Sequence, residues 1–202
     1  MVTSTQADSI LNTVYQTLGL TATTEKIKYA QIVNIVTQLQ RINATNQINV
    51  GTTGTISERL CQLGIDSVPA LMNKTRKYGK DWKWLGDFLL PGDPYDVAVS
   101  VKSFKAKERL LASGTGSLLT PTIGWGLFDD PTEWSESRSQ SYLYRGFVSI
   151  YMPVSTLLQV SAQARNVRNI NGNFLLRDLA NFSADLENGI NVGNSRISVK
   201  AL

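Results

Sequence analysis

A turn between two apolar segments limits the folds that are open to this chain. Its sequence, Pro-Gly-Asp-Pro at residues 91–94, is typical of a turn, because proline fixes φ and glycine accepts strained backbone angles. The flanking segments, at about residues 82–90 and 95–104, predict two β-strands. The turn must fold these strands back on each other, so the chain has to build a sheet around an antiparallel hairpin.

The predicted hairpin brings polar side chains together. Asp87 on the first strand faces the middle of the second, where Ser100 and Lys102 share one face because side chains alternate along a strand. The same alternation puts Asp96 on that face. Carboxylates hold Mg²⁺, which activates water and polarises phosphate, and lysine stabilises the negative charge of the transition state. The hairpin therefore predicts a site that hydrolyses phosphodiesters.

Composition excludes several other chemistries. The chain of 202 residues has no histidine, which removes Ser-His-Asp hydrolases, Cys-His proteases and His-ligated zinc enzymes. Oxygen ligands remain, and they suit Mg²⁺. Cys61 is the single cysteine, which fits a reducing cytoplasm. No apolar run approaches the ~20 residues of a membrane helix, and the N-terminus lacks the blocks of a signal peptide. We therefore expect a cytoplasmic protein without a membrane partner.

Charge favours a polyanionic partner. The net charge is +4 and the isoelectric point is about 9.2. Solvated helix faces account for part of the basic residues, but one group brackets the hairpin and its acids. This group contains Lys74, Arg76, Lys77, Lys80 and Lys83 before the turn, and Lys102, Lys105, Lys107 and Arg109 after it.

Periodicity predicts an α/β fold, a mixed β-sheet flanked by helices with an N-terminal helical segment. We expect helices at residues 4–18 and 24–42, a polar loop at 43–54, and a capping box at 55–58 that begins a short helix. Further helices are expected at about 66–79, from 130, and at 154–164 and 174–187, with strands at 147–151 and 196–201. Residues 1–202 form one predicted domain: a helical arm (1–50), a catalytic core (55–151) and a helical and loop region (152–202).

Asp87 followed by Ser100-Val101-Lys102 resembles the PD-(D/E)xK motif of type II restriction endonucleases. In that family an acid on one strand and an acid-x-lysine on the next bind the metal and the phosphate. The resemblance covers about residues 55–150 and implies a restriction-endonuclease-like core. It makes Asp87 the first acid, Lys102 the lysine, and Glu58 the upstream glutamate that completes the site, although Glu58 is equally suited to be a capping-box acid.

Two positions depart from the motif. Gly86 stands in place of the proline, and Ser100 in place of the second acid. Some restriction enzymes have Ser-x-Lys here and recruit a glutamate from the following helix, which makes Glu108 a candidate ligand; Asp96 is the other. The predicted catalytic residues are thus Asp87, Lys102, Ser100 and Glu58, and the predicted metal ligands are Asp87, Asp96, Glu108 and Glu58.

Two segments suit DNA contact. Residues 113–117 form a small Gly-rich loop whose backbone amides suit phosphates, although it lacks the rest of a nucleotide-binding P-loop. Residues 163–173 carry arginines and asparagines, which pair with guanine and adenine in the major groove, although a solvated turn has similar composition. The predicted DNA-binding residues are Lys105, Lys107, Arg109, Ser113, Thr115, Arg138, Arg165, Asn166, Arg168, Asn169, Asn171 and Asn173.

Together these features predict a Mg²⁺-dependent type II restriction endonuclease that cuts double-stranded DNA at a short palindrome without a nucleotide cofactor. Cutting both strands requires two sites related by two-fold symmetry, so a homodimer is expected. The helical arm is a candidate interface, and core packing explains its apolar residues equally well. The alternatives are a repair or phage nuclease of the same fold and a non-catalytic nucleic-acid-binding or assembly protein.

Overall fold

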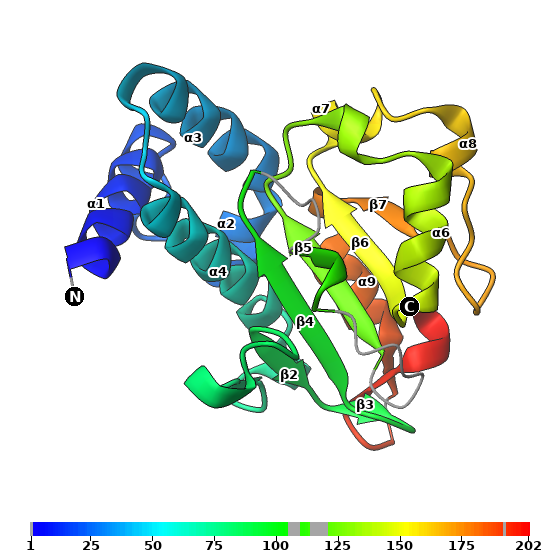
Figure 1. The fold of residues 1–202 in the computed structure, drawn as a ribbon. Helices are drawn as coiled ribbons and strands as arrows, with labels where there is room; N and C mark the ends of the chain where they lie inside the picture. Colours follow the sequence, from blue (N-terminus) through cyan, green and yellow to red (C-terminus); the bar gives the residue numbers. More distant parts are fainter. Residues whose placement is uncertain (1, 105–109, 114–120, 192) are drawn as a thin grey trace.

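The computed structural model describes residues 2–104, 110–113, 121–191 and 193–202, and a six-stranded β-sheet lies at its centre (Figure 1). The strands follow the order β1-β2-β4-β5-β6-β7 across the sheet. They are β1 (Arg76–Lys77), β2 (Phe88–Leu90), β4 (Val97–Lys102), β5 (Thr122–Gly126), β6 (Phe147–Met152) and β7 (Leu176–Asp178). Helices flank this mixed sheet, so the predicted α/β class is confirmed.

The predicted hairpin forms the antiparallel part of the sheet. β2 pairs with β4 with Phe88 opposite Val99, and β1 pairs antiparallel with β2. From β4 to β7 every pairing is parallel. Because β2 and β4 run in opposite directions, the start of β2 and the end of β4 lie at the same edge of the sheet. Asp87 and Lys102 meet at this edge, which is also the carboxyl edge of the parallel strands, where open α/β sheets bind ligands.

An N-terminal helical segment packs beside the sheet, as predicted. It contains α1 (Val2–Thr17), α2 (Glu25–Ala30), α3 (Ile32–Asn46) and α4 (Val50–Asp66). Apolar side chains of all four helices share one core cluster with β2, β4 and β5. The later helices are α6 (Glu136–Tyr144), α7 (Val154–Leu157), α8 (Ala162–Arg165) and α9 (Phe182–Gly189). Side chains of α6 and α8 form a second cluster with β6 and β7.

The apolar residues of the helical arm pack inside the chain itself. Leu11 and Val14 of α1 and Ile35 and Leu39 of α3 are buried in the first core cluster. Core packing therefore accounts for these residues of the candidate dimer interface, whereas Val33 of the same arm is exposed. The homodimer remains a prediction.

The start of α4 was predicted wrongly. The helix begins at Val50, within the expected loop, and its N-cap is Asn49, whose side chain accepts a hydrogen bond from the Thr52 amide. Thr52 and Thr53 are buried in the first turn. Burial of this turn outweighs the weak helix propensity of Gly51 and its polar neighbours, so the predicted capping box at residues 55–58 lies inside the helix.

The helix expected at 66–79 is also wrong. A 3₁₀ turn at Pro69–Leu71 follows α4, and the chain then extends into β1. The residue before a proline avoids the helical region, so Pro69 stops the helix at its first turn. The next residues are mostly exposed, and five of the eleven at positions 74–84 are basic. We call residues 74–84 the lysine-rich segment.

The C-terminal part returns to the hairpin. β3 (Gly92–Asp93), in the predicted turn, pairs with β9 (Arg196–Ser198), which also pairs with β8 (Ile190–Asn191). The strand expected at 196–201 is confirmed only in its first half, since a 3₁₀ turn at Val199–Ala201 follows β9, and the helix expected at 174–187 is β7 followed by α9. Among the described residues, no helix combines the length and apolar character needed to cross a membrane.

Candidate active site

Asp87 is fixed on the hairpin by two backbone hydrogen bonds. Its amide donates to the Val99 carbonyl at 2.7 Å, and its Oδ2 accepts from the Val101 amide at 2.7 Å. The side chain is only 12% exposed. The carboxylate is therefore held against the end of β4 before any ligand binds.

Lys102 points back toward the same place. Its Nζ donates to Ser100 Oγ at 2.8 Å and to the Val101 carbonyl at 3.1 Å, and lies 4.0 Å from Asp87 Oδ2. Ser100 is fully buried. Ser100 and Lys102 thus share a strand face with Asp87 beside them, as predicted. The hydroxyl of Ser100 is occupied in positioning the ammonium group, which is a different task from that of the acid it replaces in the motif.

Glu58, on α4, is connected to the site by ion pairs with lysine side chains. Lys83 Nζ lies 3.1 Å from Glu58 Oε1 and 3.8 Å from Asp87 Oδ1, so one ammonium group bridges both carboxylates. Lys77 Nζ lies 4.0 Å from Glu58 Oε2. Three segments far apart in the sequence therefore bring Glu58, Asp87 and Lys102 into one cluster. We call Glu58, Asp87, Ser100, Lys102 and Lys83 the acid–lysine cluster.

The carboxylates and ammonium groups of this cluster shift each other's pKa values. Burial raises the pKa of the Asp87 carboxyl above its ordinary value, and the charge of Glu58 adds to the effect, although Lys102, the Val101 amide and Lys83 oppose it. Burial lowers the pKa of Lys83, but the carboxylates of Glu58 and Asp87 outweigh burial and raise it overall. The site thus pairs Asp87, whose charged form is disfavoured by burial, with Lys83, whose charged form is favoured by its neighbours.

Glu58 and Asp87 are the two candidate magnesium ligands of the cluster. Mg²⁺ is bound in phosphoryl-transfer sites through one or two carboxylates, with water and substrate phosphate filling the other positions. Glu58 and Asp87 supply two such carboxylates. The Lys83 ammonium group lies near both of them and balances their negative charge. No group of three or more acidic, cysteine or histidine ligands occurs in the described part of the chain. The predicted ligand Glu108 lies outside the described residues.

Asp96 is not part of the cluster, which corrects its prediction as a ligand. It stands before the other end of β4, where its carboxylate contacts Arg196 Nη2 at 2.6 Å and Arg76 Nη2 at 3.4 Å and accepts a hydrogen bond from the Gly92 amide. The strand alternation was right, but a distance of six residues along a strand, roughly 20 Å, separates Asp96 from Lys102. Asp96 instead ties the turn to β9.

Comparison of the chain with known proteins identifies no relative. No family model, no curated protein and no solved structure matches the chain. The geometry of the described residues therefore carries the functional argument alone.

The asparagines of the predicted reading loop are structural. Asn169 is buried, and its Nδ2 donates to the Val148 and Leu202 main-chain oxygens at 2.6 and 2.8 Å, while its Oδ1 accepts from the amides of Asn171 and Asn173. The side chains of Asn171 and Asn173 also reach the C-terminal segment. These amides hold the chain end in this structure, and their role in reading bases stays a prediction.

Arg168 of this loop is also engaged within the fold. The Arg168 guanidinium stacks 3.6 Å from the Phe174 ring centre and donates to the Gly172 carbonyl. Arg165 and Asn166 line a cavity between α7, α8 and β7. In sheet order this region lies beside β7, at the edge opposite β1 and β2. The loop at residues 163–173 is therefore remote from the acid–lysine cluster.

The remaining predicted DNA-binding residues are partly described by the structure. Ser113 is buried, which makes its side chain a poor phosphate ligand. Arg138 is half-buried on α6 and donates to the Glu133 carbonyl at 3.5 Å. Lys105, Lys107, Arg109 and Thr115 lie outside the described residues.

Sequence reasoning missed the role of Lys83. It was grouped only with the basic residues before the hairpin, whereas its ammonium group bridges Glu58 and Asp87. The signal was the four-residue spacing to Asp87, which suits an ion pair where the chain turns. The expected extended strand hid this spacing, because strand geometry separates such residues by about 13 Å.

Proposed function

We propose that this protein is a Mg²⁺-dependent endonuclease that hydrolyses phosphodiester bonds of double-stranded DNA at a short specific sequence, as type II restriction enzymes do. The observation that carries the proposal is the convergence of Glu58, Asp87 and Lys102 from α4, the start of β2 and the end of β4. Oxygen ligands beside a held ammonium group are the set that phosphodiester hydrolysis requires.

Each side chain has a distinct task in this proposal. Glu58 and Asp87 hold the metal, which when bound polarises a phosphoryl oxygen and lowers the pKa of a coordinated water. Lys102 directs positive charge at the phosphate oxygens that gain negative charge in the transition state. Ser100 fixes the Lys102 ammonium group, and the Val101 amide fixes the Asp87 carboxylate, so neither charged group has to reorganise during reaction.

Sequence-specific double-strand cleavage further implies a homodimer, with two sites related by a two-fold axis on a palindrome. Cytoplasmic location fits the single buried cysteine, Cys61, and a substrate of intracellular or invading DNA.

The decisive test is cleavage. Purified protein is incubated with long natural duplex DNA, with and without Mg²⁺, and the products are separated on a gel. Discrete Mg²⁺-dependent bands are expected. A smear would replace sequence-specific cleavage by a repair or structure-selective nuclease, and intact DNA across diverse substrates would leave a non-catalytic nucleic-acid-binding protein.

Replacing Lys83 by methionine is expected to tighten metal binding. Its ammonium group contacts both proposed ligands, so a divalent ion must displace it. Lys83 is 53% exposed, and such ion pairs are worth about 0.2–1 kcal/mol, so we expect the Mg²⁺ dissociation constant to fall roughly 1.4- to fivefold. Isothermal calorimetry without DNA measures it.

The matched control is Lys26→Met, which removes a similar exposed ion pair, to Glu187, away from the cluster. An unchanged dissociation constant in Lys83→Met, or an equal change in the control, would show that Lys83 does not compete with the metal.

A further inference from the structure

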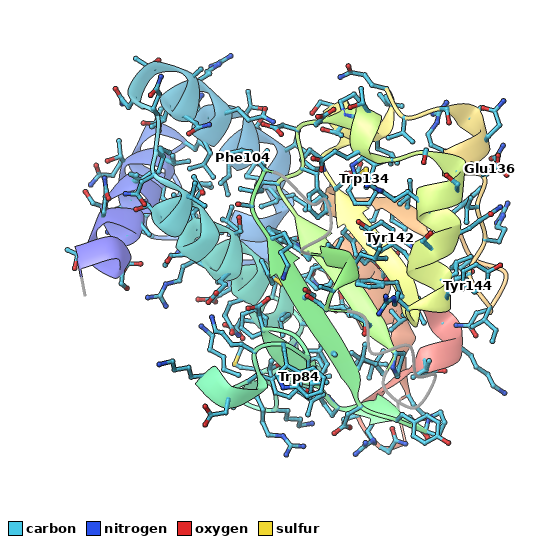
Figure 2. The ribbon with its side chains drawn as sticks, in the orientation of Figure 1. Trp84, Phe104, Trp134, Glu136, Tyr142 and Tyr144 are labelled. Atoms are coloured by element: carbon cyan, nitrogen blue, oxygen red, sulfur yellow. The ribbon has the colours of Figure 1, made fainter. Side chains whose placement is uncertain are left out.

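A large aromatic side chain is exposed next to the acid–lysine cluster. Trp84, in the lysine-rich segment, is 61% exposed, whereas Trp125 and Trp134 are buried in the core. Tryptophan is strongly buried on average, so an indole presented to solvent suggests a contact surface. Figure 2 shows Trp84 in the lower part of the view, away from Tyr144, another exposed aromatic residue, at the right.

The position of Trp84 relative to the cluster is fixed by its neighbours in the chain. Lys83 contacts Glu58 and Asp87, and Trp84 is the next residue. Adjacent Cα atoms are about 3.8 Å apart, so the backbone of Trp84 lies next to that of Lys83. Trp84 is therefore an exposed aromatic residue beside the acid–lysine cluster.

The charge around Trp84 suits a phosphate backbone. The lysine-rich segment contains five basic residues and one acid, Asp81. Arg76, Lys77 and Lys83 make ion pairs with Asp96 or Glu58. Lys74 and Lys80 are exposed and have no ion pair within the described ranges of the chain. Their charge is available for an external anion.

We propose that the lysine-rich segment is the surface that holds the DNA strand at the site, with Trp84 stacking on an unstacked base and Lys80 contacting a backbone phosphate. An aromatic ring between lysines is the pattern by which proteins bind unstacked nucleotides, because every base has a π-face and every linkage a negative charge. This inference rests on the proposed function and adds to it: the nucleotide beside the cleaved bond is pulled out of the base stack. The proposed DNA contact lies in the lysine-rich segment and not at residues 163–173, where the sequence predicted it.

The test measures binding separately from cleavage. Fluorescence anisotropy follows fluorescein-labelled poly(dT), whose bases are already unstacked, with Ca²⁺ in place of Mg²⁺ and full-length protein. Trp84→Ala is expected to weaken binding about tenfold, and Trp84→Phe, which keeps a stacking ring, is expected to restore most of the loss. Lys80→Ala is expected to reduce the slope of log K against log salt by about 0.7.

Tyr144→Ala is the matched control, because Tyr144 is 82% exposed on α6. Thermal melting verifies that each variant folds. The inference is overturned if wild-type protein does not bind poly(dT), if Trp84→Ala binds within twofold of wild type, or if Tyr144→Ala loses as much affinity.

The two proposals fail in different ways. Mg²⁺-dependent cleavage with Trp84-independent binding overturns only the stacking surface. Trp84-dependent binding without cleavage overturns the nuclease and leaves a nucleic-acid-binding surface.

Discussion

Replacing Lys102 by alanine is expected to lower the rate of DNA cleavage about 100- to 1,000-fold while duplex binding stays within about threefold of wild type. The ammonium group is held by Ser100 Oγ and the Val101 carbonyl, so it is oriented before substrate arrives. Removal of one such preorganised group has a cost of this size in other enzymes. Its side chain is only 16% exposed, so it contributes little to backbone contact with DNA.

Cleavage is followed on a plasmid in Mg²⁺, and binding on the same DNA in Ca²⁺. Lys26→Ala serves as the control for loss of one positive charge, because Lys26 pairs with Glu187 outside the cluster. Cleavage by Lys102→Ala at the wild-type rate would refute the assignment of the site. A parallel loss of binding would instead assign Lys102 to DNA contact.

The part of the fold that the sequence predicts best is the hairpin. Its turn residues and the alternation of β4 act over a few positions, and local signals of this kind decide which side chains share a face. For that reason the meeting of Asp87, Ser100 and Lys102 follows from the amino-acid sequence alone. The contact of Glu58 with the site could not be derived from these signals, because it depends on how α4 packs against the sheet; the family resemblance pointed to it.

The errors have a common cause in long-range contacts. Asp96 has the right strand parity, but it lies six residues before Lys102, just before the start of β4, where Arg196, a hundred residues later, pairs with it. Asn169 has the composition of a reading loop, but the C-terminal segment uses its amide. In both cases a polar residue that local pattern assigns to a ligand is already paired within the fold, because buried polar groups require partners.

Ser100 is placed by the local strand pattern and is also a buried polar group that is paired within the fold. Its place in the motif calls for a carboxylate, yet it is fully buried, and its hydroxyl accepts a hydrogen bond from Lys102. A carboxylate buried there would add a charge beside Asp87, whose own pKa burial already raises. The serine therefore adds no further negative charge to the cluster, and in the proposed site Glu58 would supply part of the negative charge that a metal requires.

Asp87→Asn is expected to abolish cleavage, by more than about 1,000-fold, and yet to stabilise the protein at neutral pH. Asparagine keeps an oxygen that accepts from the Val101 amide, so the hairpin geometry is retained. The loss of a charged metal ligand removes several kcal/mol of transition-state stabilisation. Stability rises because burial raises the pKa of Asp87, which means that the folded state disfavours the charged carboxylate.

The pH dependence separates this explanation from a packing effect. Between the ordinary aspartate value of 3.8 and the raised value, the folded protein binds a proton that the unfolded chain does not, so the free energy of unfolding falls as pH rises. The advantage of Asp87→Asn over wild type is therefore small below that window and complete above it. Urea unfolding without divalent ions, from about pH 3.5 to pH 8, measures this difference, with Asp81→Asn as the exposed control. A difference that does not change with pH, or a variant less stable than wild type at neutral pH, would mean that Lys83 and Lys102 compensate the carboxylate fully. The site would then carry no electrostatic strain for a metal ion to relieve.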